Sequence, residues 1–323
     1  MPPLFKYRRF HPLLIRMGHI VDSILGFFGL ASPNDEIVEK PRTLLVLESH
    51  LIGDGVMTMA FINSFKTQCP DTKVILLAQN WMQGMLPKGL VDRCIPCHLP
   101  WVGEGKLSFK RWKDFYSILS QIKNFAPDAA CETRGDWRNF LIFWLLGIPT
   151  RVGVSMSGGE RLLTHKGRMV QDTEPLYATR KALLEMFGLD SSLQLPDPPQ
   201  PGLDDKKSGS FVVVHPGASQ PLRRMSEAQM NVVLQKIPKT TSHLIVASGP
   251  GELGLQQKCL EYFSGRGLHV QSWAGGLLDF VRLCGQSEAV FAMDSGPAHL
   301  AAWSGSRTHV FCNHDSPNIV APL

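Results

Sequence analysis

The chain has 323 residues, 44% of them hydrophobic, so it can bury large cores and form about two domains. Its formal net charge is +5, but no run of lysine or arginine exceeds two residues, so nucleic-acid binding is not indicated. The basic balance suits phosphates or an anionic membrane surface. Seven cysteines spread over this length do not form the pattern of a secreted disulfide framework, so a cytoplasmic setting is expected.

The N-terminal segment, residues 5–30, is basic at first and apolar later. Four residues interrupt the apolar run at near-helical spacing and share one face: Arg16, His19, Asp22 and Gly26. This pattern predicts an amphipathic helix that does not cross a bilayer. Such a helix either lies on a membrane surface or packs against the protein, and the sequence leaves both open. Residues 1–40 comprise this helix and a linker.

Between residues 41 and 189, apolar strands alternate with helices, which predicts a doubly wound parallel sheet. Strands are expected at residues 43–49, 73–78, 128–133 and 151–155. Helices are expected at residues 53–69, 109–125 and 137–147. The last helix contains the run "FLIFWLL", which is too short to span a membrane and fits burial against the sheet.

The segment "CIPCH" matches the Cys-x-x-Cys-His pattern by which c-type haem is attached. An export signal with a cleavage site is not recognised, and no second cysteine pair completes a zinc site. We therefore expect Cys94 and Cys97 to pack beside a strand, and we expect no metal.

A stretch rich in Pro, Asp and Ser, residues 190–210, has the composition of an interdomain linker. The alternation then restarts and predicts a second parallel-sheet domain over residues 211–323. Strands are expected at residues 211–217, 243–248, 269–273, 289–294 and 308–312, and helices at 226–237, 252–264, 277–286 and 297–305. Ligands of open parallel sheets bind beyond the carboxyl ends of the strands, so the cleft between the two domains is the expected site.

The first strand of the chain leads into "ESHLIGDGV", where Gly53 and Gly55 flank Asp54. The two glycines permit another molecule to approach closely and leave the carboxylate exposed to it. The same triplet also serves as a tight turn with a helix-capping Asp. Neither a dinucleotide fingerprint nor a Walker loop is present, so hydride transfer and NTP hydrolysis lack their usual motifs.

Two strand ends in the second half carry polar residues. In "HPGASQPLRRMSEAQ", Arg223 and Arg224 precede a helix capped by Ser226. Their guanidinium groups are suited to bidentate contacts with a diphosphate, although a solvated basic loop has the same sequence. In "VASGPGEL", Glu252 follows a glycine turn, and its carboxylate is suited to accept a hydrogen bond from a ribose hydroxyl.

The segment "AVFAMDSGPAHLAAWSG" predicts a strand that turns into a helix after Asp294. Ser295 is a good N-cap, Gly296 allows close approach of a partner, and Pro297 presets the first turn. The amides and dipole of that helix start make an anion site, to which His299 adds a donor one turn later. A carboxylate in one half and an anion site in the other suit the attack of a hydroxyl on a sugar diphosphate.

The ordered motifs "SHLIGDGV", "ETRGDWRNFLIFWLLGIPTRVGV", "HPGASQPLRRMSEAQ", "ASGPGE" and "DSGPAHLAAWSG" span about residues 43–320. Together they resemble the ADP-heptose:lipopolysaccharide heptosyltransferases, family 9 of the glycosyltransferases. The resemblance implies a GT-B architecture, in which two Rossmann-like domains with doubly wound parallel sheets face a cleft. It also implies an inverting, metal-independent transfer from a nucleotide-sugar donor, ADP-heptose in the family, without a cofactor.

The acceptor implied by the resemblance is a lipid-linked glycan, the lipopolysaccharide core. The enzyme is then expected to be cytoplasmic and peripheral on the inner membrane, with membrane contact through residues 5–30. Two alternatives are a nucleotide-sugar epimerase or hydrolase of the same fold, and a degenerate, non-catalytic sugar-nucleotide-binding protein.

Residue by residue, the resemblance implies that Asp54 is the general base. It implies a phosphate contact for Arg223, with Arg224 beside it, and a ribose contact for Glu252. It implies that four residues form the donor phosphate turn: Asp294, Ser295, Gly296 and His299. Three more are expected on the acceptor side: Gly53, Gly55 and Arg134.

The chain departs from the family at three of these motif positions. Arg223 stands where the family usually has Lys, Met225 where it has Trp, and Gly55 where it has a β-branched or larger residue. Arginine keeps the charge but changes the contact geometry, so the donor base and sugar are left open.

Overall fold

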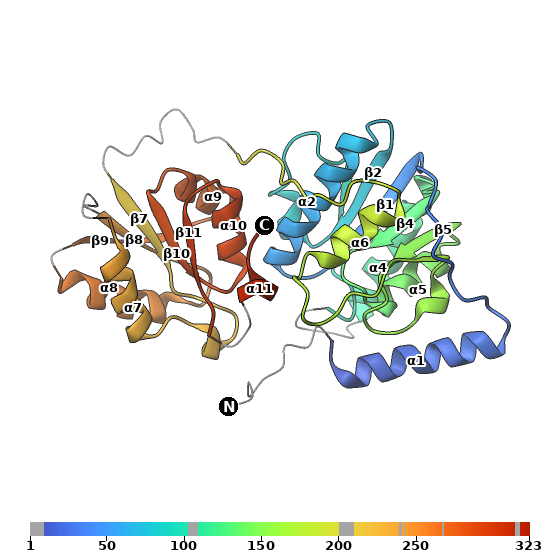
Figure 1. The fold of residues 1–323 in the computed structure, drawn as a ribbon, viewed down its shortest axis with the longest axis horizontal. Coiled ribbons are helices and arrows are strands. Elements are labelled where there is room, and N and C mark those ends of the chain that lie inside the picture. The colour runs from blue at the N-terminus through green and yellow to red at the C-terminus, as the bar shows by residue number, and fades with distance from the viewer. Residues whose placement is uncertain are drawn as a thin grey trace. The chain divides into compact units, whose positions relative to one another are not determined.

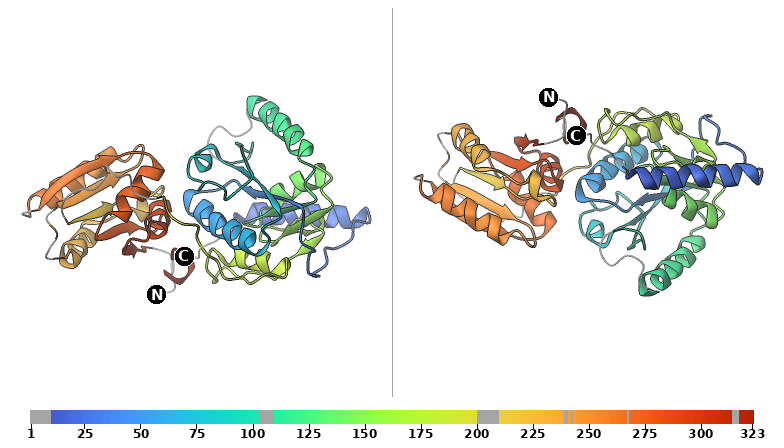
Figure 2. Two further views of the ribbon diagram at one scale, coloured as in Figure 1. Left: turned by 90° about the horizontal axis from the view of Figure 1, so that it is seen from above. Right: turned by 90° about the horizontal axis from the view of Figure 1, so that it is seen from below.

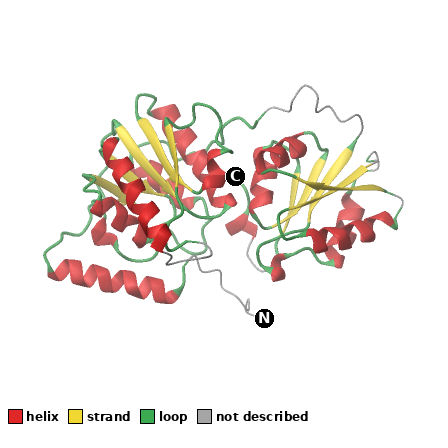
Figure 3. Ribbon diagram, turned by 180° about the vertical axis from the view of Figure 1, so that it is seen from behind, coloured by secondary structure: helices red, strands yellow, loops and turns green. Residues whose placement is uncertain are grey.

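The computed structural model of the chain describes residues 10–102, 109–199, 210–238, 241, 243–266, 268–313 and 317–323. The chain divides into two compact units, Tyr7–Pro196 and Asp197–Leu323. Each unit contains one parallel sheet with helices on both of its faces (Figures 1 and 3). The prediction of two doubly wound α/β units is therefore confirmed.

The first unit contains a six-stranded parallel sheet in the order β3-β2-β1-β4-β5-β6. Its strands are β1 Thr43–Glu48, β2 Lys73–Ala78, β3 Arg93–Pro96, β4 Ala129–Glu132, β5 Thr150–Gly153 and β6 His165–Lys166. Its helices are α1 Pro12–Phe27, α2 Ile52–Gln68, α3 Asn80–Gln83, α4 Phe109–Asn124, α5 Trp137–Leu145 and α6 Ala178–Met186, with a 3₁₀ turn, η1, at Glu160–Leu162.

The central strands of this sheet are buried on both faces, which is why β1 is apolar from Leu44 to Leu47. Side chains of α4 and α5 pack on one face against alternate residues of β1 and β2. On the other face, α2 packs against α6 and the residue that follows it, where the rings of Phe65 and Phe187 meet edge to face at 5.1 Å.

The second unit contains a five-stranded parallel sheet in the order β11-β10-β7-β8-β9. Its strands are β7 Phe211–His215, β8 His243–Ser248, β9 His269–Ala274, β10 Ala289–Met293 and β11 Thr308–Phe311. Its helices are α7 Glu227–Lys236, α8 Leu253–Ser264, α9 Leu277–Gly285, α10 Gly296–Trp303 and α11 Pro317–Val320, with a 3₁₀ turn, η2, at Pro221–Arg223. Ser226 caps α7 as predicted, in a capping box with Gln229.

Several short elements are not among those predicted, namely α3, β3, β6, α6 and α11. β3 has four residues and ends in proline, and β6 has two, so neither shows an apolar run. Cys94 lies in β3 and Cys97 follows it, buried in the core of the first unit. Burial raises the pKa of the Cys97 thiol to about 12, so this thiol stays protonated.

Helix α1 lies along the outside of the first unit, where it contacts η1 (Figures 1 and 2). Packing against the protein, one of the two alternatives open from the sequence, is therefore observed for one side of α1. Among the described residues, no helix has the length and hydropathy needed to cross a membrane.

Candidate functional site

Both sheets have a point at which the chain reverses the direction in which it adds strands. In the first sheet, β1 lies between β2 and β4, and in the second, β7 lies between β8 and β10. The first order is that of the classical dinucleotide-binding sheet, and ligands of such sheets bind at the carboxyl ends of the strands beside this switch point. The polar residues singled out from the sequence follow these strands.

In the first unit, the carboxylate of Glu48 ends β1 and is fully buried. One of its oxygens accepts hydrogen bonds from the hydroxyls of Thr58 and Thr133, both at 2.7 Å, and from Arg180 at 3.1 Å. The other accepts the backbone N–H of His50 at 2.8 Å and lies 3.3 Å from its ring Nδ1. Burial acts to raise the pKa of Glu48, but the bonds and charges of His50 and Arg180 outweigh it and lower the pKa.

The carboxylate of Asp54 lies in the first turn of α2, between two arginines. One oxygen is 3.2 Å from the Arg180 guanidinium, and the other is 3.6 Å from that of Arg134. Burial acts to raise the pKa of Asp54, but Arg134 and Arg180 outweigh it and lower the pKa. Its side chain keeps 14% of its surface exposed, so the group is ionised near neutral pH and reachable from solvent.

Arg180, which the sequence analysis did not identify, joins these two carboxylates from α6. It is 1% exposed, and its Nη2 contacts both Glu48 and Asp54. The neighbouring Thr179 donates a hydrogen bond to the carbonyl of Thr133 at 2.7 Å, which ties the start of α6 to the end of β4. The Asp54 carboxylate is therefore held by two arginines, Arg134 and Arg180, from segments that are far apart from it in the sequence.

A third buried carboxylate, Glu132, ends β4 on the other side of the switch point. It accepts hydrogen bonds from the backbone N–H groups of Arg134, Gly135 and Asp136, and from the side-chain amide of Asn139. Burial raises the pKa of Glu132 to about 7. These bonds fix the loop that carries Arg134, whose guanidinium also lies 5.5 Å from the centre of the Phe10 ring.

The two acceptor-side glycines lie in the first turns of α2 and are buried. A Cβ atom on Gly55 would lie 2.4 Å from the ring of Trp81. The absence of a side chain at this position is therefore explained by packing within the unit, where the resemblance implied a larger residue. Gly53 is likewise part of the helix rather than of a loop before it.

In the second unit, the turn after β7 is the centre of the polar cluster. The Glu252 carboxylate lies against Gly217, where a Cβ atom would come within 2.2 Å of its oxygens. The same carboxylate accepts the backbone N–H of Gly249 at 2.8 Å and lies 3.7 Å from Nε2 of His215. Burial lowers the pKa of His215 although Glu252 opposes the shift, so burial favours the neutral imidazole.

The two arginines of the same turn make different contacts. Arg223 lies 3.6 Å from the carboxylate of Asp294, so η2 and the end of β10 come together. Arg224 donates to the carbonyl of Ala218 at 3.4 Å. Met225, the other departure from the resemblance, is buried in the core of the unit rather than presented to a ligand.

Helix α10 begins directly beyond the switch point of the second sheet, with Ser295 at its N-cap position. The hydroxyl of Ser295 does not cap the helix as predicted. It donates instead to the carbonyls of Met293 and Gly217, at 3.2 and 3.4 Å. The N-terminal amides of α10, which start at Gly296, are therefore not taken up by this side chain, and His299 is buried one turn later.

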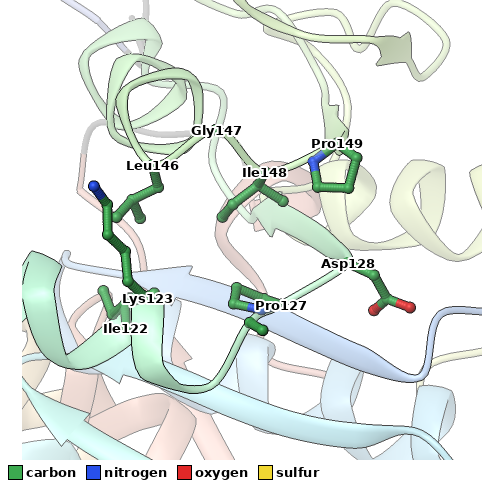
Figure 4. A pocket seen from close by; sticks show the side chains of 9 residues that line it. Ile122, Lys123, Pro127, Asp128, Leu146, Gly147, Ile148 and Pro149 are labelled. Carbon is green, nitrogen blue, oxygen red and sulfur yellow. The ribbon is translucent and has the colours of Figure 1, made fainter.

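A surface pocket of about 320 Å³ lies elsewhere in the first unit (Figure 4). It is lined by residues 122–123, 126–128 and 146–149, which lie in the segments that precede β4 and β5. It therefore lies at the amino ends of the strands, opposite to the switch-point residues. Over the described ranges, no group of three or more His, Cys, Asp or Glu side chains is arranged to hold a metal.

Two parallel α/β units, each with its polar residues at a switch point, define the class of two-domain proteins with the GT-B fold. No protein-family model and no curated protein sequence matches the chain. Solved structures do.

A family 9 glycosyl transferase from Veillonella parvula has a TM-score of 0.73 and 15% identity, over 90% of this chain and 86% of its own. The ADP-heptose lipopolysaccharide heptosyltransferase II of E. coli has a TM-score of 0.70 and 17% identity, over 87% and 88%. The E. coli heptosyltransferase WaaC, solved with ADP, has a TM-score of 0.69 and 13% identity, over 87% and 90%. The chain therefore has the fold of the family 9 heptosyltransferases, which its motifs resemble.

Proposed function

We propose that the protein is a glycosyltransferase that moves a sugar from a nucleotide diphosphate to a hydroxyl of an envelope glycan. The observation that carries this proposal is Asp54, an ionised and partly exposed carboxylate at the switch point of the first sheet. The second sheet has Arg223 and the start of α10 at its own switch point, which suits a leaving diphosphate.

In the proposed mechanism, the first unit supplies the base and the second unit holds the donor. Asp54 accepts the proton of the acceptor hydroxyl as that oxygen attacks C1 of the sugar and the bond from C1 to the diphosphate breaks. A single displacement inverts the anomeric centre. The hydroxyl becomes strongly acidic once its oxygen bonds to C1, so a carboxylate with a lowered pKa is a sufficient base.

The charge that develops on the departing diphosphate is stabilised by Arg223 and by the amides at the start of α10. Glu252 is suited to accept hydrogen bonds from a donor hydroxyl, because Gly217 leaves room for its carboxylate, which stays 15% exposed. No metal is required in this scheme, since the cationic side chain and the helix start supply the positive potential.

The solved structures that share this fold suggest the donor and acceptor. One is described as an ADP-heptose lipopolysaccharide heptosyltransferase and another was solved with ADP. We therefore propose ADP-heptose as donor and a lipopolysaccharide core as acceptor, with the reaction on the cytoplasmic side, where nucleotide sugars are made.

The proposal is tested with the Asp54→Asn variant of the full chain. Donor binding is measured by thermal shift with ADP, UDP and GDP, and transfer is measured with ADP-heptose and a truncated lipopolysaccharide core. We expect stabilisation by ADP in both proteins, and a loss of transfer of about 10³-fold in the variant, because one positioned base contributes this much. Asp35→Asn, which alters an exposed carboxylate on the same unit, serves as the matched control and should transfer normally.

Three outcomes would contradict the proposal. Full transfer by Asp54→Asn would remove the base assignment. Consumption of the donor at the same rate without acceptor would indicate a hydrolase or epimerase. Donor binding without turnover under any condition would indicate a non-catalytic binding protein.

A further inference from the structure

Helix α1 is fixed to the first unit through one side. Asp22 accepts the backbone N–H groups of Gly159 and Arg161 at 2.8 and 2.9 Å. Gly18 is buried so closely that a Cβ atom would lie 2.1 Å from the carbonyl oxygen of Ser157. These contacts set the rotation of α1 about its own axis, because no side chain larger than hydrogen fits at residue 18.

The apolar residues on this attached side cover a small hydrophobic cluster. Leu14, Val21 and Leu25 pack against the cluster that contains Trp137 and Phe140. The indole N–H of Trp137 also donates to the carbonyl of Leu14 at 3.1 Å. The attached side of α1 is therefore satisfied by the first unit itself.

A second apolar stripe runs along the side of α1 that faces away from these contacts. Its members recur at intervals of four and three residues and are 46–86% exposed: Leu13, Met17, Ile20, Ile24 and Phe27. Phe28, 74% exposed, extends the stripe, with its ring edge to face with that of Phe27 at 5.4 Å. An ordinary surface helix turns its polar residues outward, so this arrangement marks an interaction surface.

The charge that α1 itself presents outward is positive. Within Pro12–Phe27 the residues that are charged at neutral pH are Arg16 and Asp22. The carboxylate of Asp22 is turned toward the first unit and occupied by backbone amides. In the sequence, the segment before the helix adds Lys6, Arg8 and Arg9. Arg16 is exposed and adjoins the stripe, since it lies three residues after Leu13 and four before Ile20.

We propose that the outward stripe of α1 docks on an anionic lipid surface, with the helix lying in the plane of that surface. The apolar side chains enter the acyl boundary, and the basic residues meet the anionic headgroups. A second copy of the chain fits less well, because a seam between two such helices would bring basic flanks together without an acidic side chain on the outward face.

The test uses the full chain and sedimentation with vesicles of phosphatidylcholine, with and without phosphatidylglycerol. We expect the parent protein to bind vesicles that contain phosphatidylglycerol and to bind less as salt is raised. The affinity of the variant Ile20→Glu/Ile24→Glu for these vesicles should be lower by about ten-fold or more, because the variant removes two inserting side chains and adds negative charge. Both positions are exposed, so its thermal unfolding should match that of the parent.

The matched control is Ile37→Glu/Met169→Glu, which makes the same charge change at apolar residues of the same unit that are 70% and 84% exposed. It should bind vesicles within about two-fold of the parent. Equal sedimentation of the stripe variant and the parent would overturn the proposal. So would a parent that ignores both kinds of vesicle, or one that light scattering shows as a dimer which the stripe variant dissociates. None of these measurements depends on turnover, so they are independent of the proposed transferase activity.

Discussion

The buried arginine of α6 offers the sharpest test of how the first unit holds its candidate base. Replacing Arg180 by Met leaves the Glu48 carboxylate buried without its cation. At 3.1 and 3.2 Å and an effective dielectric constant of about 20, Arg180 attracts each of Glu48 and Asp54 by about 5 kcal/mol. The variant also avoids the cost of burying the arginine charge, which offsets several kcal/mol of this lost attraction. We therefore expect a net loss of about 4 kcal/mol in the free energy of unfolding.

The loss is measured by urea denaturation followed by tryptophan fluorescence, since five of the seven tryptophans lie in residues 10–196. The pH dependence supplies a second check. Both carboxylates have lowered pKa values in the folded parent, so their contribution is present above the unfolded pKa values and is lost as the pH falls. The deficit of the variant should therefore be fully present near pH 7 and should shrink as the pH falls below about 4.5, the ordinary pKa of a glutamate such as Glu48.

The matched control is Arg168→Met, which removes an arginine of the same unit that is 43% exposed and contacts Glu174 and Glu185. Surface pairs of this kind contribute about 0–1 kcal/mol. If Arg180→Met costs no more than Arg168→Met, Arg180 does not hold these carboxylates and the reasoning about Asp54 fails with it.

Two further predictions concern buried groups at the switch points. The pKa of Glu132 is raised from 4.5 to about 7, so the parent loses stability as the pH rises through this window. Relative to the parent, Glu132→Gln should therefore gain about 3 kcal/mol in the free energy of unfolding between pH 5 and pH 8. A stability difference between variant and parent that is the same at both pH values would contradict this. Gly217→Ala should weaken binding of the proposed donor, ADP-heptose, by about ten-fold, as Glu252→Ala should, because the added Cβ displaces the Glu252 carboxylate. In calorimetry, Gly254→Ala, with no atom within 4 Å of the added carbon, should bind as the parent does.

Most of the fold could be predicted from the sequence because the central strands of both sheets are buried on both faces. β10 is apolar throughout and β1 is apolar from Leu44 to Leu47, and the ends of both strands fall within one residue of the predicted ones. The short strands β3 and β6 could not be found this way, since a two- or four-residue edge strand need not bury an apolar face.

The candidate site could be predicted only where it follows a long strand. Asp54 and Asp294 stand out because each comes soon after an apolar run, beside glycine and a helix start. Arg180 could not be identified, since in a sequence a buried arginine looks like an exposed one, and its partner Glu48 is 132 residues away. Glu48 itself carried a signal, as an acidic residue that ends a buried strand two residues before a histidine.

The two-sided packing of α1 also affects how the protein should be prepared for crystallisation. Removing residues 1–34 to avoid an exposed apolar helix would uncover Trp137 and the cluster beneath Leu14, Val21 and Leu25. It would also leave the amides of Gly159 and Arg161 without the Asp22 carboxylate. A truncated protein would thus expose a different apolar surface in place of the stripe. Polar substitutions confined to the outward stripe would instead leave the cluster around Trp137 covered.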